Sequence, residues 1–277
     1  MIEVILDKSF ISDFGDIGLE VGRLIDKILL NKNNIFVINS LLIAYIEENI
    51  NKNVTYKWED YFTYLSDNNK LKTSHSNTLD TNIIFNEPQR QFDYVMVLKS
   101  ENGISSENYS CNLQLASDND MFFRDLLEKN QVTLRNFHFD SNNSIKQFFK
   151  KLFNCSKTNK RVIIVSRYNN FTCDLIEVLN DKFQQKSFWT TYKGSSDSST
   201  NFTLLQRQLG NSLMLFTGTN TQIHERKIII GNLIVELDDD FNKITADLDT
   251  WTCNCSVDKI LATKLASKQN TLRRKYS

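Results

Sequence analysis

The stretch Ile223-His-Glu-Arg-Lys-Ile-Ile-Ile-Gly-Asn-Leu-Ile-Val-Glu-Leu-Asp-Asp-Asp-Phe241 has two apolar runs on either side of Gly231-Asn232. A Gly-Asn dipeptide between apolar runs predicts a two-residue β-hairpin loop. The predicted register pairs Ile230 with Leu233, Arg226 with Leu237 and His224 with Asp239. Because side chains alternate across a strand, one face carries His224, Arg226, Ile228, Ile230, Leu233, Val235, Leu237 and Asp239. The other face carries Glu225, Lys227, Ile229, Ile234, Glu236 and Asp238. The first face is therefore expected to be a core surface that ends in a polar group.

The composition predicts a soluble globular protein. Of 277 residues, 40% are hydrophobic, and 33 Lys and Arg balance 33 Asp and Glu, so any affinity for nucleic acid must be local. No stretch approaches the ~20 apolar residues of a membrane span. The five cysteines form no disulfide or zinc framework, which favours reduced thiols and a cytoplasmic protein.

Strand and helix patterns alternate along the chain. Apolar runs at 3–6, 35–38, 112–116, 132–139, 162–165, 185–192 and 213–217 predict strands, and 251–256 predicts an edge strand. Helical periods cover 18–30, 40–50, 118–127, 145–153, 170–183 and 257–265, with Ser40 as a helix cap. The segment 51–82 is expected to hold one short helix and a loop at 67–81, and 92–99 fits helix or strand. The basic tail 268–277 is expected to be frayed.

This alternation predicts an α/β protein with two domains, 1–140 and 141–277. The first is expected to have a parallel sheet with flanking helices, and the second a mixed sheet that contains the hairpin. A polar break at 154–160 is an alternative boundary, because the strand-helix pattern restarts after it.

Carboxylates in the N-terminal half follow strands or lie on nearby helices. They are Asp7 after the first strand, Glu48 on a helix, Asp93 before the 94–98 run, and Asp118 at a helix start. Such carboxylates can hold Mg²⁺ or Mn²⁺ for phosphodiester cleavage, because hard cations prefer oxygen ligands. Asp residues at strand ends are also ordinary helix caps and turn residues, which is the alternative.

The order of these acidic residues, with Leu6-Asp7-Lys8-Ser9 after the first strand, resembles a PIN-domain nuclease over about residues 1–150. The resemblance implies that Asp7, Glu48, Asp93 and Asp118 are metal ligands and catalytic residues for cleavage of RNA or DNA. It also suggests a prokaryotic toxin or an antiviral defence component.

The hairpin carries a partial phospholipase D motif. In such phosphodiesterases an HxK(x)₄D motif supplies the histidine nucleophile, and here the sequence reads His224-Glu-Arg226, with Gly231 or Asn232 in place of the Asp. No second copy exists, so His-dependent catalysis would require a symmetric dimer with His224 at its interface.

The stretch from His224 to Phe241 more closely resembles the non-catalytic phospholipase D-like domain at the C-terminus of MIT-domain proteins, over about residues 140–265. That resemblance implies binding and assembly, with His224, Arg226 and Asn232 as phosphate-binding residues. An alternative reading is a structural ion pair between His224 and Asp239 across the hairpin.

Three functions follow from the sequence. The first is a metal-dependent nuclease with a phospholipase D-like binding domain. The second is a non-catalytic module that binds a phosphate-bearing ligand or a protein, including another copy of itself. The third is the dimeric phosphodiesterase that uses His224.

Overall fold

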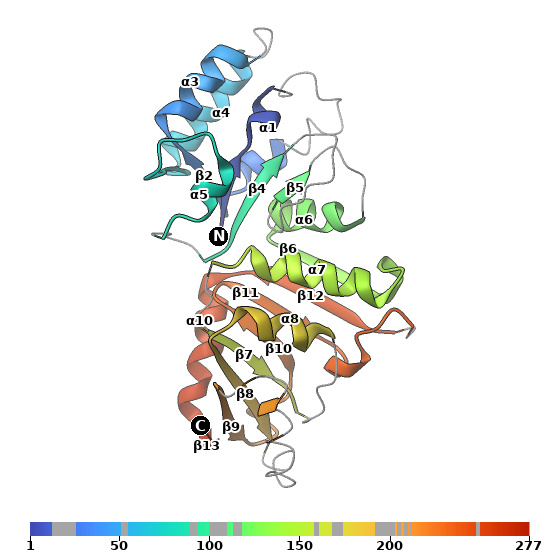
Figure 1. Ribbon diagram of the computed structural model, residues 1–277. Coiled ribbons are helices and arrows are strands. Elements are labelled where there is room, and N and C mark those ends of the chain that lie inside the picture. Colours follow the sequence, from blue (N-terminus) through green and yellow to red (C-terminus); the bar gives the residue numbers. More distant parts are fainter. Residues whose placement is uncertain are drawn as a thin grey trace. The chain divides into compact units, whose positions relative to one another are not determined.

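The computed structural model describes residues 1–12, 26–50, 55–88, 93–99, 110–112, 118–157, 161–167, 174–191, 203, 206–207, 210, 212–247 and 250–276. The chain forms two compact units, unit 1 (Met1–Gln131) and unit 2 (Val132–Ser277) (Figure 1). The predicted α/β class is confirmed: unit 1 has a parallel sheet, and unit 2 has a mixed sheet that contains the hairpin. In the part of the chain described, no helix combines the length and the apolar character needed to cross a membrane.

Unit 1 is built on a five-stranded sheet in the order β3-β2-β1-β4-β5, and every neighbouring pair is parallel. The strands are β1 (Ile2–Leu6), β2 (Asn34–Ile38), β3 (Leu71–Thr73), β4 (Val95–Lys99) and β5 (Ser110–Asn112). The helices of unit 1 include α1 (Lys8–Ser12), α3 (Ser40–Asn49), α4 (Thr55–Asp67), α5 (Thr81–Phe85) and α6 (Asp118–Lys129). Helices lie along the chain between β1 and β2, between β2 and β3 and between β3 and β4, because a tight turn cannot join strands that run in the same direction.

The central strands of unit 1 are buried because helices cover the sheet. All five residues of β1 and the first four of β4 are buried, as expected for apolar runs in a parallel sheet. On one face, Ile84 and Phe85 of α5 pack with Ile5, Val37, Val95 and Val97. On β1, fully buried Glu3 accepts a hydrogen bond of 2.7 Å from Lys72 of β3, so its charge is paired.

Several details of unit 1 differ from the sequence expectations. The polar segment 51–82 contains a 13-residue helix, α4, and the strand β3, where a short helix and a loop were expected. Asn39 caps α3 by accepting from the Leu42 amide, so Ser40 is the first helical residue and not the cap. The ambiguous 92–99 run contains the strand β4. Of the helix expected at 18–30, residues 26–30 are helical, and 13–25 lie outside the described residues.

Unit 2 is built on an eight-stranded mixed sheet in the order β13-β9-β8-β7-β10-β11-β12-β6. Strands β7, β8 and β9 are parallel, and β10, β11, β12 and β13 pair antiparallel with their neighbours. The strands are β6 (Gln131–Arg135), β7 (Arg161–Val165), β8 (Gln185–Thr191), β9 (Leu213–Gly218), β10 (Arg226–Ile230), β11 (Leu233–Leu237), β12 (Thr252–Val257) and β13 (Arg273–Tyr276).

The predicted hairpin is confirmed in its register. Ile230 pairs with Leu233 and Arg226 with Leu237, and Gly231 has φ 55°, a left-handed value that costs glycine no steric strain. Both faces of the hairpin are buried, whereas one was expected to form the core. The second face carries Ile229 and Ile234, which pack in a cluster with α10 (Lys259–Ser267).

Two further helices, α7 (Asn142–Asn154) and α8 (Asp174–Lys182), pack against each other over the opposite face from α10 (Figure 1). Helix α7 begins at the cap Ser141, whose hydroxyl accepts from the Ser144 amide. Its apolar residues recur every three or four positions and are buried: Ile145, Phe148, Phe149, Leu152 and Phe153. This spacing makes one apolar stripe toward the sheet and leaves the lysines of α7 on the other side.

Three expectations for the strands of unit 2 were wrong in detail. The strand expected at 132–139 within the first domain is β6, which ends at Arg135 and belongs to the sheet of unit 2. The strand expected at the sheet edge, β12, lies between β11 and β6. The hydroxyl of Thr133 on β6 donates a hydrogen bond to the side-chain oxygen of Asn254 on β12. The tail expected to be frayed forms a 3-10 turn at Lys268–Thr271 and the strand β13, which pairs with β9.

Candidate anion-binding cleft and the predicted site residues

The open end of the hairpin places its polar residues in structural contacts. Arg226 donates from Nε to Asp240 at 2.6 Å and from Nη1 to the Asp238 carbonyl at 3.0 Å. Asp239 pairs with Lys243 at 3.1 Å, and His224 is exposed. Among the described residues no ion pair joins His224 to Asp239, so the predicted pair does not form.

The three predicted phosphate-binding residues do not converge. Arg226 is at the start of β10, and Asn232 lies in the turn beyond its end, so β10 alone separates them by about 14 Å. Asn232 is 3% exposed, and its carbonyl accepts from the Asp258 amide. With Asp238 and Asp240 already engaging Arg226, the hairpin base offers a phosphate little unpaired positive charge.

On the second hairpin face, Lys227 is a paired, buried cation. Its ammonium lies 2.6 Å from a Glu225 oxygen and 2.5 Å from a Glu236 oxygen, with 10% of its side chain exposed. Burial alone would lower the pKa of Lys227, but hydrogen bonds to the two carboxylates raise it above its usual value. Lys227 therefore has a structural role in the hairpin, as the partner of these two carboxylates.

Asp7 lies where the nuclease hypothesis requires, at the carboxyl end of β1, and is 9% exposed. Its Oδ1 accepts from the Ser9 amide at 2.9 Å and the Ser9 hydroxyl at 2.8 Å. These are capping bonds at the start of α1, so a structural role accounts for the carboxylate.

The other predicted metal ligands are not brought to Asp7. In the parallel pair β1–β4, Leu6 is level with Leu98 and Glu3 with Val95, which puts Asp93 at the opposite end of the sheet. A rise of about 3.3 Å per residue separates Asp7 and Asp93 by roughly 20 Å. Glu48 is exposed on α3, and the Asp118 side chain lies outside the described residues.

Asp7 and Asp93 therefore cannot belong to one metal site. The described residues contain no group of three or more His, Cys, Asp or Glu side chains arranged to hold a metal ion. Mg²⁺ and Mn²⁺ need several oxygen ligands around one point, and Asp7 and Asp93 cannot both supply them.

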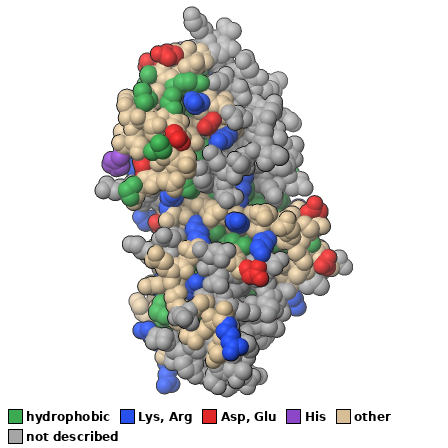
Figure 2. Space-filling model, viewed as in Figure 1, with side chains coloured by type: hydrophobic (Ala, Val, Ile, Leu, Met, Phe, Trp, Pro, Cys, Tyr) green, Lys and Arg blue, Asp and Glu red, His purple; other side chains and the backbone are tan. Residues whose placement is uncertain are grey.

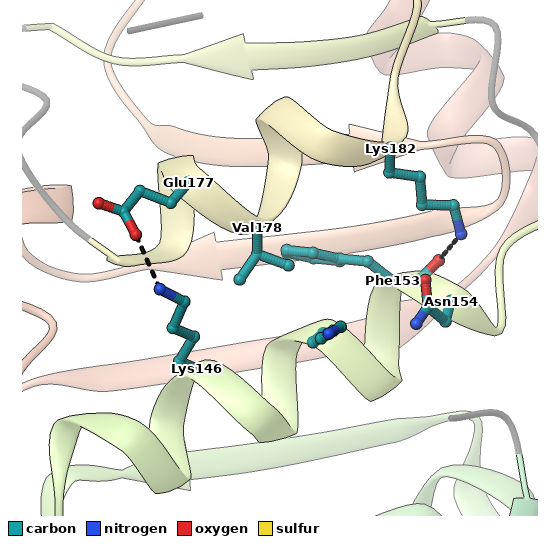
Figure 3. Close-up of a pocket in the computed structure, with 7 residues that line it drawn as sticks. Lys146, Phe153, Asn154, Glu177, Val178 and Lys182 are labelled. Carbon is teal, nitrogen blue, oxygen red and sulfur yellow. Dashed lines mark hydrogen bonds and ion pairs between the residues drawn. The ribbon is translucent and has the colours of Figure 1, made fainter. Parts of the chain in front are cut away.

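A cleft between α7 and α8 gathers basic side chains instead (Figure 3). It has a volume of about 590 Å³, within the range of small-ligand sites. Its lining is Lys146, Lys150, Phe153 and Asn154 from α7, and Glu177, Val178 and Lys182 from α8. Phe153 and Val178 form an apolar wall between the polar ends.

The ion pair at one end of the cleft is open to solvent. Lys146 Nζ lies 2.7 Å from Glu177 Oε2, and these side chains are 37% and 68% exposed. Exposed ion pairs contribute about 0–1 kcal/mol, so the contact with Glu177 holds Lys146 only weakly. Lys150, one helical turn further along α7, is exposed, and no hydrogen bond or ion pair joins it to another described residue.

At the other end, Lys182 joins the two helices. Its ammonium donates to the Phe153 carbonyl in the last turn of α7 and to the Ser156 carbonyl at 2.7 Å. Burial lowers the pKa of Lys182 to about 8, because the site removes water from the charged form. Lys182 therefore carries a positive charge at neutral pH and offsets the negative end of the α7 dipole.

The sequence analysis missed this cleft, although part of its signal is visible. Lys146 and Lys150 are four residues apart, which places them on one helix face. That Lys182 joins them depends on the packing of α8 against α7, which the local pattern of neither helix specifies.

No protein-family model matches the chain, and no curated protein is significantly similar to it. Several solved structures are similar to parts of it, including the following three. Nuc, a phospholipase D family member from Salmonella typhimurium, is 15% identical with a TM-score of 0.36, over 47% of this chain and 89% of Nuc. NucT from Helicobacter pylori is 10% identical with a TM-score of 0.36, over 51% and 92%. Polyphosphate kinase from Porphyromonas gingivalis is 12% identical with a TM-score of 0.40, over 59% and 29%.

Similarity at this level does not establish a shared activity, so the function rests on the residues of the cleft. The relationships to PIN domains and to MIT-domain proteins stay predictions.

Proposed function

We propose that the protein is a non-catalytic binding protein, and that the cleft between α7 and α8 holds a phosphate-bearing ligand. The observation that carries the proposal is that Lys146, Lys150 and Lys182 line one cleft with a single carboxylate, Glu177. Three positive charges and one negative charge give the cleft a net charge of +2 when all are ionised, in a chain whose formal net charge is zero. A phosphate dianion matches that charge.

The other candidate sites lack the groups that catalysis would require. His224 lies beside Arg226, which engages Asp240, and the chain has Gly231 or Asn232 where a phosphodiesterase motif would have its Asp. The described carboxylates do not converge on a metal. Unit 2 therefore binds phosphate in the α7/α8 cleft and not at the hairpin.

Calorimetric titration with inorganic pyrophosphate at low salt tests the proposal. Wild-type protein is expected to bind, and Lys150→Gln to bind about tenfold more weakly, since one charge-assisted hydrogen bond contributes about 1.5 kcal/mol. Lys264→Gln is the matched control, because Lys264 is an exposed lysine on α10. Equal binding by wild type and Lys150→Gln would refute the cleft as the site.

A second assay tests the absence of catalysis. Labelled RNA and DNA incubated with the protein and Mg²⁺ are expected to stay intact. Cleavage that EDTA abolishes would contradict the proposal and restore the metal-dependent nuclease. Cleavage that resists EDTA and is lost in His224→Ala would restore the phosphodiesterase.

A further inference from the structure

A second concave site lies in unit 1, between α3 and α4. Its volume is about 240 Å³, and its apolar lining comes from Ile43, Ile46, Ile50, Trp58 and Phe62. Ile46, Ile50 and Trp58 are buried, while Ile43 and Phe62 are half-buried and accessible from outside. The site is smaller than the roughly 300–1,000 Å³ of small-molecule sites, and its size suits a few apolar side chains of a peptide.

The rim of this groove is acidic on both sides. Glu47 of α3 and Glu59 of α4 line it, and both are exposed. Glu48 and Asp60, the next residues on each helix, are exposed as well. Over this part of unit 1, Figure 2 shows green hydrophobic side chains with both red carboxylates and blue cations beside them.

The neighbouring lysine of α4 does not cancel this charge at the groove. Lys57 lies 3.2 Å from Asp26 and is not among the lining residues. The groove therefore combines an apolar floor with carboxylates on both flanks. A partner that is complementary to this groove presents an apolar stripe flanked by lysine or arginine.

We propose that the α3/α4 groove docks an amphipathic, basic segment of a partner protein. Apolar side chains spaced three or four residues apart enter between Ile43 and Phe62, and flanking cations meet Glu47 and Glu59. The apolar contacts supply most of the affinity. The carboxylates select the sign of the partner's charge and make binding weaken as salt is added.

A fluorescently labelled helical peptide of leucine and lysine, with leucine at i, i+3, i+4 and i+7, is the probe. Anisotropy with the full chain at low salt is expected to show binding, and the same peptide with glutamate for lysine is expected not to bind. The double variant Glu47→Lys/Glu59→Lys is expected to lose at least tenfold in affinity. The matched control is Asp67→Lys/Asp93→Lys, which changes the net charge equally at exposed positions outside the groove.

Four results would overturn the proposal. They are no binding by wild type, equal binding by the groove variant and wild type, equal loss in the control variant, or equal binding of the glutamate peptide. Sedimentation tests the other occupant: self-association of wild type that the groove variant abolishes would assign the groove to a second copy of the chain. Pyrophosphate binding in unit 2 is expected to be unchanged in the groove variant.

Discussion

Removing the two carboxylates around Lys227 is expected to destabilise unit 2 more than removing Lys227 itself. In Glu225→Gln/Glu236→Gln the ammonium stays 10% exposed without a counter-charge. Breaking a buried pair from one side costs about 3–5 kcal/mol, and the remaining amide oxygens reduce this to about 2–3 kcal/mol. In Lys227→Met the carboxylates that remain are 56% and 42% exposed and regain water, so the expected change is within about 1 kcal/mol.

Tryptophan fluorescence in urea can report this difference for unit 2. The chain has three tryptophans, and Trp58→Phe as a common background leaves Trp189 and Trp251, both in unit 2. The reasoning is wrong if Lys227→Met is destabilised as much as the double glutamine variant. The direction in which stability changes with pH also follows. Because the pKa of Lys227 is raised on folding, its contribution to stability is present below the unfolded pKa and is lost as pH rises through the folded pKa.

Four other outcomes are expected. Because the pKa of Lys182 is lowered to about 8, its positive charge falls about tenfold between pH 7 and pH 9. The probe for this pH series is AMP, whose phosphate is mostly a dianion throughout the range, and calorimetry should show its affinity falling by up to the same factor. Constant affinity would exclude Lys182 from the site. The same depressed pKa means that stability rises with pH between about 8 and 10.5, and Lys182→Met, compared by urea unfolding across this window, should lack that rise. Gly231→Ala should cost about 1–2 kcal/mol in unfolding free energy, since φ is 55°; no loss would mean that the turn can relax. Asp7→Asn should cost less than about 1 kcal/mol by the same measurement, because an amide oxygen can still accept from Ser9, and a larger loss would show that the charge itself matters.

The hairpin was predictable because its register depends on local information. Apolar alternation on both sides of Gly231-Asn232 fixes which residues pair, and the structure confirms Arg226 with Leu237. The burial of the second face was not predictable from the hairpin alone. It depends on α10, about thirty residues later, which covers Ile229 and Ile234.

Short strands with weak hydrophobic patterns were not predicted, because they form only through pairing with a neighbouring strand. Strand β3 is three residues long and half exposed, and it becomes a strand through pairing of Leu71 with Phe36 of β2. Strand β13 is rich in Arg and Lys, which suits a sheet edge that must stay open to water. In sequence, a short basic segment of this kind looks the same as a disordered tail, and only its pairing with β9 identifies it as a strand.

The relative placement of the predicted site residues was not predictable for a related reason. Asp7 and Asp93 are both next to strands, but the parallel register puts them at opposite ends of the sheet. Residues at strand ends converge only when both follow their strands, and Asp93 precedes β4. The basic cleft was missed because it is formed by two helices 20 residues apart along the chain.

The central claim is that a phosphate ligand binds between α7 and α8 and not at the hairpin base. NMR of protein labelled in its valine methyl groups and its histidine rings, observed during addition of pyrophosphate, separates the two sites. The methyl signals of Val178, in the wall of the cleft, are expected to move in a saturable way, while the ring signals of His224 stay in place. Movement of the His224 signals with Val178 unchanged would contradict the account.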